Sequence, residues 1–444
     1  MANTGLPGFL LAFVLAWVLY FVGVALLPAH SAYGRVSEAI MLQIDFALLT
    51  SASALAVWRL SDGINWNPAS GVPADTAESG RLRLASRLGL ALSVAGLLAL
   101  FIDKVFIQGI DYLSGLAAAR AEWTNLGAER EGISSFWSAL GYLLSTCFFV
   151  SICVLVVHGD IFSAKERMIS WVSSLGLLLG NSALTGGRSF LLLLGAATVA
   201  GFYLRADLGK SLPRVGGRLI LAASAAVGIA GAYALYVFAA RAELTDVDAH
   251  RYAVEMLEFL GAHPTPAFER LSGDSSLGLL AGLLALALAY LIHSVFTFAA
   301  ILDMPPHSEH LLFGYLRELA AKLGFIDRPD LNWALVGRFT SLPGALYIDA
   351  GVGLLVAGAV TLGVLMTASV RLCQRYPSSL TALSAWVAVQ TTALLSPLLL
   401  AAEVLSYPFV IAEFFLIAAV AGLAQVCTRL PWPLRLRVVS SEPG

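Results

Sequence analysis

The chain contains a series of long apolar segments, and this feature limits its fold more than any other. Eleven of them approach the length of about 20 residues that an α-helix needs to cross a bilayer core. They cover residues 7–27, 38–58, 88–107, 134–158, 168–184, 189–204, 219–240, 276–301, 344–370, 380–402 and 405–426. Strands of transmembrane barrels are only about ten residues long. The segments therefore predict an all-α, polytopic transmembrane helical bundle.

The composition agrees with a chain that is buried in lipid. Hydrophobic residues make up 58% of the 444 residues and charged residues only 13%, whereas soluble domains average about 25% charged residues. A soluble enzyme of this size could not cover its surface with so little charge. The net charge of −2 indicates no nucleic-acid partner. With no repeat and no polar stretch of domain length, residues 1–444 are expected to form a single integral membrane domain.

Basic residues predict the orientation of the chain. They gather in the connections 59–87 and 205–218, after the segments 344–370 and 405–426, and at Lys165 and Arg167. The positive-inside rule places all of these in the cytoplasm. The opposite side then receives the loops at about 108–133, 241–275 and 302–343. Two of these loops flank the apolar segment 276–301, so a single crossing by that segment would separate them. Either 276–301 is re-entrant, or the C-terminal half is inverted.

Two stretches within these loops have apolar residues at helical spacing, 247–260 and 309–323. They predict short amphipathic helices that lie on the membrane face or cap a cavity. Ordinary loop helices that shield the bundle are the alternative.

Arginines recur near span ends on the non-cytoplasmic side. Arg188 lies in a glycine turn, TGGR, where Gly186 and Gly187 let backbone N–H groups approach an anion. A guanidinium matches phosphate oxygens, and a helix that begins at Ser189 would add its positive dipole end. The candidate pyrophosphate-binding residues are Arg120, Arg188, Arg241 and Arg338. For each of them, a surface role at the lipid headgroups is the alternative.

Two residues are candidates for catalysis. His293, whose side chain type titrates near neutrality, could take a proton from a hydroxyl; a hydrogen-bonded core histidine is the alternative. Asp349 could act as a base or pair with an arginine. Aromatic residues near the same span ends could stack on a sugar ring, namely Tyr112, Tyr290 and Tyr347.

No motif indicates a cofactor or a metal. The four cysteines form no C-x-x-C pair, which argues against a disulfide framework or a structural zinc site. His307 and His310 have a ligand-like spacing near Asp303 but lack further clear ligands. We therefore expect neither a metal nor another cofactor.

The order of these motifs resembles the Wzy-type O-antigen polymerases, which join oligosaccharide repeat units. The resemblance rests on FIDKVFIQGIDY with the later AAAR, then TGGRSF, YLIHS and FTSLPGALYIDAGVGLL before a long apolar span. It extends from about residue 100 to 370. It implies a membrane glycosyltransferase of the bacterial inner (cytoplasmic) membrane, with its active site facing the periplasm.

The resemblance also implies substrates and partners. The growing glycan would leave undecaprenyl pyrophosphate and join an incoming lipid-linked unit, building O-antigen or a related surface polysaccharide without a nucleotide sugar or a metal. Donor, acceptor and membrane lipid are the expected partners, together with a chain-length regulator protein. The resemblance implies that the functional roles of the family's periplasmic arginines carry over to Arg120, Arg188 and Arg241. It implies a functional role for His293 less directly. The alternatives are an O-antigen ligase, which transfers the finished glycan to lipid A core, and a transporter or flippase of lipid-linked oligosaccharides.

Overall fold

The structure is a computed structural model. It describes residues 6–62, 76–128, 134–185, 189–211, 228, 249–266, 268, 276–304, 311–322, 324–327, 335, 338–401 and 407–429.

Nearly all regular elements of the described residues are helices. In the N-terminal half these elements are α1 (Gly8–Leu26), β1 (Ala29–Ser31), α2 (Val36–Ser61), α3 (Thr76–Phe101), the π-helical η1 (Ile102–Ile107), α4 (Leu116–Ala128), α5 (Phe136–Leu144), α6 (Phe148–His158), the 3₁₀ turn η2 (Gly159–Ile161), α7 (Ala164–Thr185) and α8 (Ser189–Asp207). The C-terminal half contains α10 (Ala249–Phe259), β2 (Ala262–Pro264), α12 (Ser276–Ile292), α13 (Ser294–Leu302), α14 (Leu311–Lys322), α15 (Leu342–Arg375), α16 (Leu380–Leu395) and α17 (Tyr407–Arg429).

The prediction of a helical multi-pass membrane protein is confirmed, but the number of spans is smaller than expected. Seven helices of the described residues are long and apolar enough to cross a membrane, the pair α5–α6 counting as one. The pair α12–α13 passes the same test only as a unit bent by 52°, while α16 and α17 are shorter apolar helices. The predicted span 219–240 lies outside the described residues apart from Gly228. Eleven crossings are therefore not reached.

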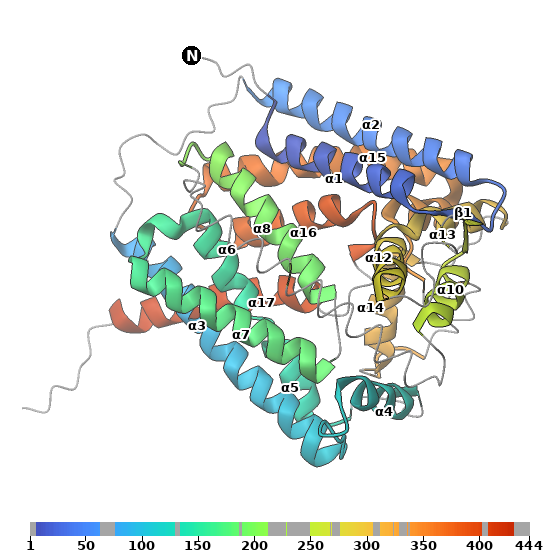
Figure 1. Cartoon of the computed structure of the whole chain (residues 1–444). Helices are drawn as coiled ribbons and strands as arrows, with labels where there is room; N and C mark the ends of the chain where they lie inside the picture. Colours follow the sequence, from blue (N-terminus) through green and yellow to red (C-terminus); the bar gives the residue numbers. More distant parts are fainter. Residues whose placement is uncertain are drawn as a thin grey trace, which may run out of the picture.

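The helices form two groups that share a common centre (Figure 1). Helices α1, α2 and α15 lie together, and α3, α5, α6 and α7 form the second group. Helices α8 and α16 lie between the groups and contact both α1 and α15, while α8 also contacts α6. Large apolar side chains fill the centre, including Phe13, Phe46, Phe149 and Trp386, none more than 1% exposed. The polar candidate sites are thus held by a rigid apolar scaffold.

The packing of α2 on α15 is closest around Gly363. A Cβ atom at this position would lie 2.0 Å from Oγ of Ser53 and 2.4 Å from the carbonyl oxygen of Thr50. Small residues allow such close approach between helices in membranes. Further along, the Arg371 guanidinium stacks 3.6 Å from the ring centroid of Trp58. Helices α2 and α15 are therefore in close contact both at Gly363 and at Arg371.

The segment 276–301 is flanked by two contacts to the chain between α1 and α2, one made by a pair of short strands and one by an arginine. Strand β1, between α1 and α2, pairs antiparallel with β2, which precedes α12. The carbonyl of Leu302, at the end of α13, accepts a hydrogen bond from Nη1 of Arg35, which follows β1. We call the end of the bundle that carries β1 and β2 the ribbon side. Strand β2 and the end of α13 thus lie on the same side. The pair α12–α13, bent by 52°, fits either a broken span or a re-entrant loop, so the choice between the re-entrant and the inverted alternative stays a prediction.

The two predicted amphipathic helices are present as α10 and α14, close to their expected limits. Both lie on the ribbon side (Figure 1). A third helix, α4, lies within the predicted loop 108–133, for which no helix was predicted. Which face of the membrane the ribbon side occupies stays a prediction.

Candidate functional site

The α12–α13 break lies at His293 and is held by hydrogen bonds to backbone atoms. Nδ1 of His293 lies 2.8 Å from the carbonyl oxygen of Tyr290, and Nε2 lies 2.9 Å from the backbone nitrogen of Phe339. A carbonyl only accepts and an N–H only donates, so the ring is neutral with its proton on Nδ1. The side chain is 1% exposed. This geometry matches the alternative of a hydrogen-bonded core histidine. Both ring nitrogens already have backbone partners, which argues against the predicted role as a base.

A buried polar layer continues from the break to neighbouring helices. The Ser294 hydroxyl donates to the carbonyl of Pro397 at 2.6 Å and lies 2.8 Å from the Tyr20 hydroxyl. The backbone N–H of Leu342, at the start of α15, donates to the carbonyl of Ser396 at 3.0 Å. Three interrupted stretches of chain therefore meet at one depth, which is tolerated in a membrane only where other protein groups satisfy the freed backbone.

Arg338 lies beside this layer, in the segment that leads into α15. Its Nη1 donates to the Tyr33 hydroxyl, and its guanidinium carbon lies 5.3 Å from the ring centroid of Phe259. No carboxylate of the described residues lies within ion-pair distance of Arg338. The side chain is half-buried. A partly exposed guanidinium with an aromatic neighbour and no acidic partner is suited to bind an anion.

Aromatic rings surround the same point. The Tyr290 ring lies 5.6 Å from the His293 ring and 5.7 Å from the Phe339 ring, the latter at 84°. Tyr347 instead packs at 5.8 Å against Phe298 of α13. Of the predicted sugar-stacking residues, the structure thus places Tyr290 next to the break and Tyr347 in the contact between α13 and α15.

Asp349 does not pair with an arginine of the described residues. Its two carboxylate oxygens accept the backbone N–H groups of Leu311, at 2.9 Å, and Leu312, at 3.2 Å. These are the first two residues of α14, whose N-terminal N–H groups lack partners within the helix. A carboxylate there also interacts favourably with the helix dipole. The structure therefore replaces the expected arginine partner with a helix N-terminus.

The region around Arg120 forms a separate polar site at the end of α7. Nη1 of Arg120 donates to the carbonyl of Thr185 at 3.2 Å, and the Tyr112 hydroxyl donates to the carbonyl of Leu184 at 2.7 Å. Burial raises the pKa of Tyr112 to about 12, which keeps it a donor. A cation near a helix C-terminus is favourable because the last carbonyls carry partial negative charge. Arg120 thus contacts Thr185, which lies three residues before Arg188 in the sequence.

The arginine cluster as a whole extends beyond the described residues. Arg188 and Arg241 lie outside them, and the described partners of Arg120 and Arg338 do not overlap. Arg120 and Arg338 both lie on the ribbon side. Arg338 contacts Tyr33, next to β1. Arg120 contacts the end of α7, near the start of α8, and α8 runs antiparallel to α1 because its last residue, Asp207, accepts a hydrogen bond from the backbone N–H of Gly8 at the start of α1. A shared pocket for all four arginines stays a prediction.

Two buried charged side chains in η1, Asp103 and Lys104, were not among the predicted site residues. Asp103 accepts hydrogen bonds from the hydroxyls of Ser134, at 2.9 Å, and Ser135, at 2.6 Å, and also from Gln108. Nζ of the adjacent Lys104 lies 4.1 Å from the Trp123 ring centroid. Both charged residues are at most 1% exposed. The signal was present as an Asp-Lys pair inside an apolar segment, and π-helical turns frequently occur at functional sites.

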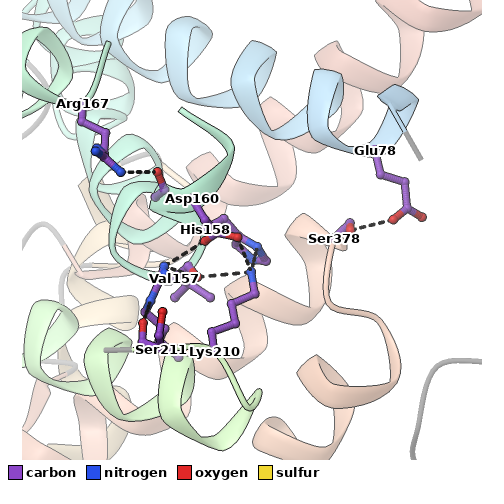
Figure 2. A network of polar contacts seen from close by, with 10 residues as sticks. Glu78, Val157, His158, Asp160, Arg167, Lys210, Ser211 and Ser378 are labelled. Carbon is purple, nitrogen blue, oxygen red and sulfur yellow. Dashed lines mark hydrogen bonds and ion pairs between the residues drawn. The ribbon is translucent and has the colours of Figure 1, made fainter. Parts of the chain in front are cut away.

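A second polar network lies at the opposite end of the bundle (Figure 2). Asp160 pairs with Arg205 at 2.9 Å and lies 3.8 Å from Lys210. Nζ of Lys210 is 2.8 Å from Nδ1 of the buried His158. These contacts join the end of α6 to Arg205 and Lys210, at the end of α8 and just after it.

No metal site emerges from the described residues, which contain no group of three or more His, Cys, Asp or Glu able to hold an ion. His307 and His310 lie outside them. Comparison of the chain with protein-family models, with curated proteins and with solved structures finds no match.

Proposed function

We propose that the protein is a membrane glycosyltransferase that polymerises undecaprenyl-pyrophosphate-linked repeat units at its ribbon side, which would face the periplasm of a bacterial inner membrane. The proposal rests on the ordered motifs of the sequence and on one structural observation. Arg338 presents a guanidinium that has no carboxylate partner among the described residues, beside a broken helix and within an apolar bundle that could hold polyprenyl chains.

The chemistry requires a cation at this position. When a sugar leaves a pyrophosphate, negative charge develops on the phosphate oxygens, and donors aimed at that charge lower the barrier. Arg338 has the Tyr33 hydroxyl and the Phe259 ring to orient it. Remaining N–H groups of its fork can then face an anion. Arg188 and Arg120 would contact the same leaving group or the second lipid-linked substrate.

The proposal gives His293 and Asp349 positioning roles instead of acid–base roles. Both are bonded to backbone N–H groups of other segments. His293 would hold the break next to Tyr290, whose ring is then available at the edge of the site as a surface for a sugar. Asp349 would hold α14 over the start of α15.

The test is an assay of the full-length protein in lipid nanodiscs with lipid-linked repeat units, with glycan chain length resolved on a gel. One charge-assisted bond contributes about 1.5–3 kcal/mol, so Arg338→Ala should lower the rate about 10- to 150-fold. Arg188→Ala should behave similarly. Arg338→Lys should recover only part of the rate, because an ammonium lacks the planar fork.

Arg251→Ala is the matched control. This arginine lies on α10 and pairs with Glu255 at 2.9 Å, with a side chain that is 71% exposed. The control should polymerise at the wild-type rate. Wild-type chain length in a correctly inserted Arg338→Ala protein would refute the role of Arg338.

A transporter or flippase of lipid-linked oligosaccharides is the second candidate, favoured by interrupted helices. The α12–α13 pair is bent by 52°, and α15 contains non-helical residues at Ala350 and Gly351. Interrupted helices near the membrane centre are typical of secondary transporters. In the same nanodisc or liposome system, movement of the lipid-linked unit without a new glycosidic bond would select this candidate.

A further inference from the structure

A second buried acidic group lies far from the ribbon-side site, on the last apolar helix. Glu413 of α17 is 0% exposed. Its Oε1 accepts a hydrogen bond of 2.6 Å from the Thr146 hydroxyl. Its Oε2 is buried and accepts no hydrogen bond of normal geometry from the described residues, although the Cys147 thiol lies close to the carboxyl group. A carboxyl group with a vacant, buried oxygen inside an apolar helix is expensive, and such groups are functional by default.

Thr146 belongs to an interruption in the transmembrane pair α5–α6. Residues 145–147 form turns between the two helices, and glycines of α3 let that helix approach them closely. A Cβ atom on Gly96 would lie 2.3 Å from the backbone nitrogen of Ser145, and one on Gly89 would lie 2.7 Å from the carbonyl oxygen of Cys147. The interruption is therefore enclosed by protein, as irregular backbone at membrane depth must be.

More unpaired oxygens flank the same interruption. Nδ2 of Asn181, on α7, donates to the Ser145 hydroxyl at 2.8 Å, while Oδ1 of Asn181 is buried without a partner among the described residues. The Ser93 hydroxyl is likewise buried and unpaired within the described part of the chain. Ser93 lies on α3 between the two glycines that touch the interruption. Side chains of α17 and α7 are thus bonded to residues of the interruption, and Ser93 adds a buried hydroxyl on the helix that contacts it.

No described basic residue neutralises Glu413. None of the ion pairs among the described residues includes it. The arginines of the neighbouring α3 contact other groups: Arg81 pairs with Glu78, Arg83 donates to the carbonyl of Ile161, and Arg87 pairs with Glu166. The titratable groups beside Glu413 itself are weak acids. These are the Cys147 thiol at the interruption, the Tyr142 hydroxyl on α5, whose ring stacks on Phe409 of α17, and the Tyr407 hydroxyl on α17 itself. The packed faces of α3 and α16 contribute serines, glycines and apolar residues. An ionised Glu413 would therefore be an uncompensated charge in a low-dielectric environment.

We propose that Glu413 and the α5–α6 interruption form an intramembrane binding site for one small monovalent cation, a proton or a sodium ion. Oε2 of Glu413 would carry the proton or, with oxygens from Asn181 and Ser93, ligate the sodium ion. Unwound helices with a nearby carboxylate are a known way to bind these ions inside membranes. The site is additional to the proposed glycosyl transfer and does not depend on it.

The test uses infrared spectroscopy of the full-length protein in lipid, which detects the C=O band of a protonated carboxyl group. For a proton site, wild type should show a band that Glu413→Gln lacks and that weakens as the pH is raised, irrespective of the salt. For a sodium site, the band should also weaken at constant pH when sodium chloride replaces choline chloride. A band that responds to neither, or that persists in Glu413→Gln, would overturn the proposal.

A second measurement requires no variant. Dicyclohexylcarbodiimide is an apolar reagent that attaches to protonated carboxyl groups, and mass spectrometry locates the modified residue. Glu413 should be labelled at low pH and less at high pH, and sodium ions should protect it if sodium binds. Thr146→Val, which removes the donor to Oε1 but keeps the carboxyl group, should shift the labelling profile toward higher pH. Labelling of Glu413 that is independent of pH and sodium would contradict an exchangeable cation.

Glu255→Gln serves as the control variant, because this glutamate is on an exposed face of α10. It should leave the infrared band, the labelling of Glu413 and the sodium response unchanged. An equal loss of the band in Glu255→Gln and Glu413→Gln would also overturn the assignment.

Discussion

The backbone N–H of Phe339 donates to Nε2 of His293 over 2.9 Å, although the two residues are 46 positions apart. The bond joins the break between α12 and α13 to the segment that leads into α15. Because Nδ1 donates to Tyr290, the imidazole is held in one tautomer and one orientation. The histidine therefore links two interrupted stretches of chain beside Arg338.

Replacing His293 with Ala should lower stability. The change leaves the buried Phe339 N–H without an acceptor, and an unsatisfied buried group costs about 1–3 kcal/mol. His293→Gln, which keeps an acceptor, should lose less. Thermal unfolding of the detergent-solubilised variants measures the difference. A His293→Gln protein with wild-type stability but no polymerase activity would instead support a direct catalytic role.

Replacing Asp349 with Ala should loosen α14. The variant loses both acceptors for the first N–H groups of this helix, and loss of a helix cap costs about 0.5–2 kcal/mol. Asp349→Asn retains one carbonyl oxygen and should show a smaller effect. Hydrogen exchange of the peptide that covers residues 311–322 should increase in the order wild type, Asn, Ala. Unchanged exchange in Asp349→Ala would show that other contacts hold the helix.

Two glycines of α3, Gly89 and Gly96, should tolerate no side chain. Gly89→Ala and Gly96→Ala would place a methyl group against backbone atoms of the α5–α6 interruption, and overpacking costs about 1–3 kcal/mol. Gly176→Ala on α7 is the control, because nothing lies within 4 Å of its added Cβ. That control should be neutral or slightly stabilising, since alanine favours the helix by about 1 kcal/mol. Equal thermal midpoints for the three variants would argue against the close packing.

Stability should depend on pH through Lys210. Burial lowers the pKa of Lys210, and nearby Arg205 lowers it further, while Asp160 acts in the opposite direction. The folded state thus binds this proton less tightly than the unfolded state. The resulting penalty is complete below the folded-state pKa and disappears as the pH rises toward the unfolded value of about 10.4. Wild type should therefore gain stability relative to Lys210→Met on going from about pH 7 to about pH 10. A difference in thermal midpoint that does not change over this interval would contradict the direction of the shift.

Local patterns in the sequence determined the class of the protein. Hydropathy over about 20 residues identified helices such as α1, α2 and α15, because the cost of placing polar groups in lipid acts on each segment separately. Helical periodicity also identified α10 and α14. The polar residues near span ends were chosen as candidates for catalysis and anion binding, and these roles stay predictions; the structure buries His293 and leaves Arg338 half-buried.

Only the tertiary structure decided which partners these residues meet. His293 meets Phe339, and Asp349 meets the start of α14, because contacts over tens or hundreds of residues depend on how whole helices pack. The pairing of β1 with β2 and the bond from Arg35 to Leu302 placed β2 and the end of α13 on one side of the bundle, which the distribution of basic residues could not establish. Glu413 lies inside an apolar helix whose sequence does not reveal that the side chain points toward the interruption in α5–α6 instead of toward lipid. Hydropathy is a property of one segment, whereas the satisfaction of a buried polar atom is a property of the assembled bundle.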